Sequence, residues 1–88
     1  MIFMRPLERD VRAFVLRALL AAEGIPMQDD VLKTSLVGAY SHVAFTAGDI
    51  EGHVRFCERA GWIAGTRDDL QGVVWVLTPL GRIRAQGL

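Results

Sequence analysis

The segment of residues 62–78 constrains the fold of this chain most, because it has the pattern of a β-hairpin at the end of a helical sequence. Residues 62–66 form a first extended run, and residues 67–72 (RDDLQG) form a polar turn. Residues 73–78 are rich in β-branched and aromatic residues, as is typical of strands, and Pro79 ends the run because proline cannot donate to a ladder. A two-stranded hairpin is unstable alone in water, so we expect it to pack against helices.

Two helices are expected in the first half of the chain. The first begins near Pro6 and continues with helical apolar spacing to a stop at Gly24. Leu16 and Leu20 fall outside its main apolar stripe, which suggests that this helix contacts a second subunit. The second helix is expected over residues 27–39, with acidic residues in its first turn. Its inward face is expected to hold Val31, Leu32, Ser35, Leu36 and Ala39.

A third helix is expected to begin at Thr46, which forms a capping-box-like pattern with Asp49. The connector before it, residues 40–45, is apolar enough to pair briefly as a strand. Gly61 provides a left-handed stop at the end of the helix. Its inward face is expected to hold Ile50, Val54 and Cys57.

This order predicts a fold that is mainly α with a small β-hairpin. Residues 80–86 are expected to add one or two helical turns after the second strand. A chain of 88 residues has room for one core, so we expect a single domain over residues 1–88. The predicted architecture is a three-helix bundle that carries a two- or three-stranded antiparallel sheet.

The composition limits the partners of such a domain. Ten basic and ten acidic residues cancel, and both halves of the chain are balanced when it is split after Phe45. Nucleic-acid-binding domains usually have a basic patch or a high pI, so this balance counts against strong non-specific DNA affinity. A hydrophobic content of 51% is high for so short a chain and favours an apolar interface, and we therefore expect a homodimer.

The sequence favours a cytoplasmic protein without a membrane partner. Cys57 is the single cysteine, which excludes an intrachain disulfide and fits a reducing compartment. Residues 1–9 do not have the pattern of a signal peptide. No stretch approaches the roughly 20 apolar residues that span a membrane.

Two motifs carry a resemblance to a known family. Residues 52–63 (GHVRFCERAGWI) resemble the end of the recognition helix in winged-helix regulators, where an apolar-x-x-apolar-x-x-x-Gly-apolar-apolar run leads into the first wing strand. Residues 76–82 (VLTPLGR) resemble the Leu-Thr-x-x-Gly ending of the second wing strand in that family. The layout is also similar to small regulator-like winged-helix proteins of Mu-like phages and prophages. The places of the first motif are filled by Val54, Cys57, Gly61, Trp62 and Ile63.

The resemblance implies that the outward face of the third helix reads DNA in the major groove. The candidate DNA-binding residues are Thr46, Gly48, Glu51, Gly52, Arg55, Arg59 and, at the wing, Arg67. Arg55 and Arg59 are one turn apart and suit guanine edges or phosphates, while Thr46 and nearby amides suit a phosphate at the helix start. The alternative is a solvated helix face with a Glu51–Arg55 pair, followed by a plain polar turn whose acidic residues repel phosphates.

The sequence contains few patterns that are typical of metal or catalytic sites. His53 and Cys57 share a helical spacing, but two ligands do not make a structural zinc site, and the spacing of His42 does not supply a third. Cys57 is better explained as a small core residue. We find no phosphate loop, no nucleophile elbow and no pattern of paired catalytic carboxylates, so we expect no enzyme, no cofactor, no metal and no small-molecule substrate.

Two functions remain open from the sequence. The first is a winged-helix DNA-binding protein, of the kind found among phage-type or bacterial transcriptional regulators, with double-stranded DNA as its partner. The second is a winged-helix module for protein–protein interaction or assembly that does not bind DNA. Fold alone does not decide between them.

Overall fold

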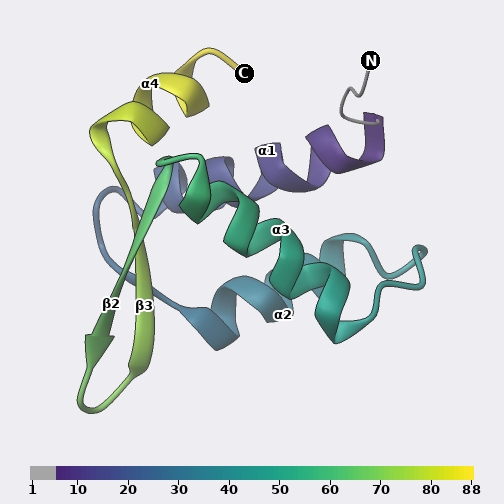
Figure 1. The fold of residues 1–88 in the computed structure, drawn as a ribbon, viewed down its shortest axis with the longest axis horizontal. Helices are drawn as coiled ribbons and strands as arrows, with labels where there is room; N and C mark the ends of the chain where they lie inside the picture. Colours follow the sequence, from purple (N-terminus) through teal and green to yellow (C-terminus); the bar gives the residue numbers. More distant parts are fainter. Residues whose placement is uncertain (1–5) are drawn as a thin grey trace.

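The computed structural model describes residues 6–88, which form four helices and three short strands (Figure 1). The chain runs through α1 (Pro6–Ala21), β1 (Met27–Gln28), α2 (Asp29–Ala39) and α3 (Ala47–Arg59). The hairpin strands β2 (Ile63–Asp68) and β3 (Gly72–Leu77) follow, and α4 (Pro79–Gln86) closes the chain. The expected fold class, mainly helical with a small antiparallel sheet, is confirmed at this level.

The sheet has three antiparallel strands in the order β1-β3-β2. The expected hairpin is present, with Ile63 opposite Leu77 and Asp68 opposite Gly72. On the other edge of β3, Met27 pairs with Trp75 and Gln28 with Val74. β3 is therefore the central strand and is paired on both sides.

The third strand corrects two sequence expectations. Residues 27 and 28 were expected in the second helix, but they pair with β3, and α2 begins at Asp29. Residues 40–45 were considered as a brief strand, but they form turns, bends and irregular backbone. The physical reason is a tertiary contact. The edge of β3 offers backbone hydrogen bonds to the segment that follows Pro26, and the local sequence of that segment does not show that such an edge lies nearby.

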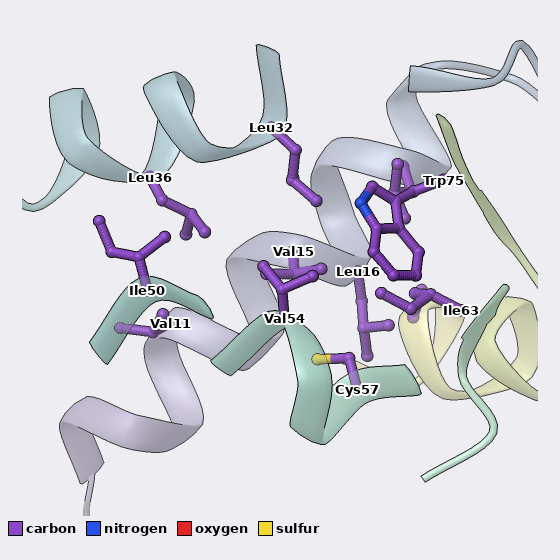
Figure 2. Packing of buried hydrophobic residues seen from close by; sticks show 12 residues of the cluster. Val11, Val15, Leu16, Leu32, Leu36, Ile50, Val54, Cys57, Ile63 and Trp75 are labelled. Atoms are coloured by element: carbon purple, nitrogen blue, oxygen red, sulfur yellow. The ribbon is translucent and has the colours of Figure 1, made fainter. Parts of the chain in front are cut away.

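One hydrophobic cluster joins all these elements (Figure 2). α1 lies against α2, α3, α4 and β3, and its buried side chains meet those of the other helices and of the hairpin. Ile50, Val54 and Cys57 point into the cluster from α3, as expected. The most deeply buried side chains are Val11, Val15, Leu16, Leu32, Leu36, Val54, Cys57 and Ile63.

The burial pattern corrects the expected faces of α1 and α2. Leu16 is 2% exposed and belongs to the core, and Leu20 is partly buried against it, so neither widens a free apolar surface on α1. On α2, Leu32 and Leu36 are buried as expected. Val31 and Ala39 are exposed, because α2 contacts the body of the protein along a narrower stripe than the sequence pattern suggested.

The hairpin is fixed to the helices at its open end. Gly61 has φ +80° and turns the chain from α3 into β2, as its expected role of helix stop requires. The amide of Thr78 donates to the carbonyl of Trp62 at 3.0 Å, and the hydroxyl of Thr78 accepts from the amide of Gly81 at 3.0 Å to cap α4. Gly81 lies so close to Trp62 that a Cβ at this position would be 1.8 Å from the Trp62 carbonyl oxygen. This contact gives the Leu-Thr-x-x-Gly motif a steric reason.

Candidate recognition surface on α3 and the hairpin

The outward face of α3 is uncovered by any other described element. Gly48, Gly52, Arg55 and Arg59 are exposed, and Glu51 is partly buried. A Cβ at Gly52 would meet nothing within 4 Å, so the middle of this face is open. The structure thus brings the five candidate positions of α3 onto one side of the helix, opposite the buried stripe of Ile50, Val54 and Cys57.

The first turn of α3 is capped by the side chains of Thr46 and Asp49. The Thr46 hydroxyl accepts from the Asp49 amide at 3.1 Å, and the Asp49 carboxylate accepts from the Thr46 amide at 2.9 Å. These bonds, the backbone bond first, hold the pKa of Asp49 below its usual value. A negative charge therefore already occupies the place where Thr46 was expected to help hold a phosphate.

Arg55 is engaged by two carboxylates on its own helix. Its Nε lies 2.8 Å from Oε1 of Glu51, one turn before it, and its NH1 lies 2.9 Å from Oε1 of Glu58. The bonds to Glu58 and then to Glu51 raise the pKa of the guanidinium. The positive charge of Arg55, a candidate for reading a base, is thus balanced by a carboxylate on each side.

Glu51 also receives Lys33 from α2. The Lys33 ammonium contacts the Glu51 carboxylate and lies 2.9 Å from Oδ2 of Asp29. The hydrogen bond from Lys33 is the main reason that the pKa of Glu51 is lowered. Burial alone would lower the pKa of Lys33, but its bonds to the two carboxylates outweigh burial and raise it.

Asp29 extends this network to the sheet. The indole Nε1 of Trp75 on β3 donates to Oδ1 of Asp29 at 2.8 Å. Partial burial alone would raise the pKa of Asp29. The hydrogen bonds from Trp75 and Lys33 outweigh burial, and the pKa is lowered. Sequence reasoning missed Asp29, Lys33 and Glu58 as neighbours of the candidate face, although the three-residue spacing of Arg55 and Glu58 was a readable signal.

The hairpin turn adds further negative charge. Asp68 accepts the amides of Leu70 and Gln71 at 2.8 and 2.9 Å and so orders the turn. Arg67 lies at the end of β2, opposite Val73, and is exposed. Neither Arg67 nor Arg59 forms an ion pair with another described residue. Asp69 stands next to Arg67 and Asp68 and is also exposed.

Charge is unevenly shared between two parts of the described chain. The segment of residues 27–72, which supplies α2, α3 and the hairpin turn, contains seven acidic residues: Asp29, Asp30, Asp49, Glu51, Glu58, Asp68 and Asp69. It contains four basic residues: Lys33, Arg55, Arg59 and Arg67. Among the other described residues, five arginines face three acids: Arg9, Arg12, Arg17, Arg82 and Arg84 against Glu8, Asp10 and Glu23. The segment that supplies α2, α3 and the hairpin turn is thus acidic overall, whereas the rest of the described chain is basic.

A cavity of about 620 Å³ lies beside the start of α3, between it and α1. Gly48 and Gly52 line it together with Arg12 and His53. His53 packs edge-on against Phe45, and burial followed by the charge of Arg12 lowers the pKa of its imidazole. No local sequence pattern predicts this cavity, because it depends on how α1 crosses α3.

Comparisons with family models, with curated proteins and with solved structures found no match for this chain. Within residues 6–88, no helix is both long and apolar enough to cross a bilayer. In the same part of the chain, histidine, cysteine and acidic residues form no group of three or more that would suit a metal ion. Cys57 lies in the core beneath α3, and burial raises the pKa of its thiol to about 11.

Proposed function

We propose that this chain is a winged-helix domain, with α1–α3 as its helical body and the β2–β3 hairpin as its wing. The order of the elements, the β1-β3-β2 sheet and the turn from α3 into β2 at Gly61 support this class. The role that the geometry supports best is recognition of another protein, rather than reading of DNA. Of the two functions open from the sequence, this is the second.

One observation carries this choice: Arg55 is bound on both sides by Glu51 and Glu58. Reading a guanine edge takes the free donor fork of a guanidinium, and phosphate contacts depend on uncompensated positive charge. Two of the five N–H donors of Arg55 already bind carboxylates, and these carboxylates balance its positive charge. A DNA contact through Arg55 would also bring Glu51 and Glu58 close to the phosphates, which repel them.

The rest of the surface supports the same role. Asp49 stands at the start of α3, and Asp68 and Asp69 stand at the hairpin turn, so both ends of a groove-binding surface carry negative charge. Surfaces of alternating sign suit protein partners, for which charge complementarity selects the partner and orients it. The uncovered middle of α3, at Gly48 and Gly52, borders the cavity beside α1 and leaves room for a partner.

The second candidate is a DNA-binding transcriptional regulator. Arg59 and Arg67 favour it, because both are exposed and neither is paired with a carboxylate of the described chain. Such a regulator would rely mainly on these two side chains, because the positive charge of Arg55 is already balanced by Glu51 and Glu58.

Fluorescence anisotropy of labelled generic duplex DNA with the full chain separates the two functions. Our proposal predicts no binding at low salt, where phosphate contacts are strongest, and no difference between the wild type and Arg59→Ala. Binding that falls steeply with added salt and is weakened by Arg59→Ala would instead establish the DNA reader, because counterion release has that signature.

A further inference from the structure

The turn of the hairpin presents an unprotected leucine. Leu70 is 96% exposed, the highest value among the large hydrophobic side chains of the described residues. The backbone at Leu70 is ordered, because the amides of Leu70 and Gln71 both donate hydrogen bonds to the Asp68 carboxylate. The carboxylate of Asp69 stands directly beside it in the sequence. The backbone of the turn is therefore ordered, and it carries one apolar and two acidic side chains at consecutive positions.

A cavity of about 270 Å³ with the opposite character lies between α1 and α4. Its walls include the apolar side chains of Ala13, Leu16 and Trp62, and its rim carries Arg9, Arg12 and Arg84. No acidic side chain of the described chain lines it. The volume is close to the lower end of pockets that take small ligands, roughly 300 Å³, and so suits a single inserted side chain.

The three arginines are differently engaged. The Arg12 guanidinium lies 3.6 Å from the centre of the Phe56 ring and 3.5 Å from a Glu8 oxygen. The Arg84 guanidinium lies 5.5 Å from the centre of the Trp62 ring, and neither Arg84 nor Arg9 is paired with a carboxylate of the described chain. Two positive charges at the rim of the cavity are thus available to carboxylates.

A chain cannot fill its own cavity with its own turn. Figure 1 shows the turn at the lower left and α4 at the upper left, at opposite ends of the hairpin strands. β3 runs the whole way from the turn to α4, and its six residues span roughly 20 Å at the usual strand rise. A contact between the two surfaces therefore joins two molecules.

We propose that the hairpin turn of one copy inserts Leu70 into the α1–α4 cavity of a second copy, where Asp68 and Asp69 face Arg9 and Arg84. The fit rests on the opposite charges of turn and cavity and on the apolar character that both share. The partner is a second copy of this chain, and the inference rests on the proposed role in protein recognition. Two such contacts can close a two-fold dimer, and single contacts can continue into longer assemblies.

Sedimentation velocity of the full chain over a range of concentrations tests this contact. The wild type should associate with rising concentration, and Leu70→Ser should raise the dissociation constant by about tenfold or more, since a buried leucine is lost. Arg84→Glu should do the same from the other side of the contact. Val37→Ser is the matched control, because Val37 is also exposed but lies on α2, away from both surfaces.

A mixing experiment makes the test specific. Leu70→Ser keeps an intact cavity and Arg84→Glu keeps an intact turn, so their equimolar mixture should form a one-to-one complex although each alone stays monomeric. A wild type that is monomeric at every concentration would overturn the proposal, and so would association that Leu70→Ser leaves unchanged. Circular dichroism checks that each variant folds. If Arg84→Glu does not fold, the effect of Leu70→Ser on association decides the test.

The two proposals fail separately. If the chain is monomeric and does not bind duplex DNA, the proposed turn-to-cavity contact is wrong, but the proposed recognition of another protein stands. A chain that binds duplex DNA with steep salt dependence would remove the proposed function itself.

Discussion

The indole of Trp75 and the carboxylate of Asp29 lie 46 residues apart in the sequence and meet in a 2.8 Å hydrogen bond. The bond joins the central strand of the sheet to the first turn of α2. Trp75 is 2% exposed, so its N–H has little access to water as an alternative partner. Asp29 therefore stabilises three things at once: the indole, the start of α2 and the ammonium of Lys33.

Asp29→Ala should lower the free energy of unfolding by about 2 kcal/mol, because it leaves a buried donor without an acceptor. Asp30→Ala is the matched control. Asp30 occupies the same first turn but is exposed, so only its interaction with the helix dipole is lost, about 0.5 kcal/mol. Urea denaturation at neutral pH measures both, and equal losses would contradict the role assigned to the Trp75 bond.

Two glycines should respond to alanine in opposite directions. Gly81→Ala places a methyl group against the Trp62 carbonyl, and the loss should be at least about 2 kcal/mol because backbone has to move. Gly52→Ala places a methyl group in open space on α3 and should stabilise the protein by up to about 1 kcal/mol through helix propensity. Thermal denaturation of the pair checks the signs, and a tolerant Gly81 would refute the packing of α4 on Trp62.

The hairpin and α3 were predictable from sequence because their signals are local. Residues 73–78 have strand composition, Thr46 and Asp49 form the capping box, and Gly61 takes the left-handed backbone that its position suggested. Each of these features depends on neighbours within a few positions. Signals of this kind can be read without knowing how distant segments pack.

β1 and the charge network were not predictable, because they depend on segments distant in sequence. Met27 is a strand residue only because β3 presents an edge to it. The Arg55–Glu51 pair followed from helical spacing, whereas the contact between Lys33 and Glu51 depends on how α2 crosses α3. Helical spacing predicted that the five candidate positions of α3 share one face, whereas the charge balance of that face depends on the fold.

Stability should fall at alkaline pH because of Cys57. Burial raises the pKa of its thiol from 9.0 to about 11, so between these values the unfolded chain gives up a proton that the folded chain keeps. Stability from this group is complete below pH 9.0 and is lost as pH rises through the folded value, by about 2–3 kcal/mol. Urea midpoints from pH 8 to 11 measure the slope.

Cys57→Ala is the control for the alkaline slope. The variant should be less stable at neutral pH because it leaves a small cavity, but its stability should fall less above pH 9.0. A residual slope is expected from Tyr40, whose pKa is raised by burial and then by Asp10. An alkaline slope identical to that of the wild type would show that the thiol does not titrate as its burial requires.

His53 should produce an acid-side loss that begins before the carboxylates titrate. Its pKa is lowered below 6.5, first by burial, so the unfolded chain binds a proton more readily than the folded chain. Its contribution to stability is complete above pH 6.5 and is lost as pH falls through the folded value. His53→Gln should flatten the profile of unfolding free energy against pH just below pH 6.5.

We propose that Glu51 and Glu58 keep Arg55 from binding DNA. The most direct measurement is the salt dependence of duplex DNA binding, by anisotropy, for the wild type and for the double variant Glu51→Gln/Glu58→Gln. We predict no binding by the wild type and a gain of salt-sensitive binding by the variant, in which Arg55 has lost both carboxylate partners. Equal binding by both proteins, with the same salt slope, would contradict it.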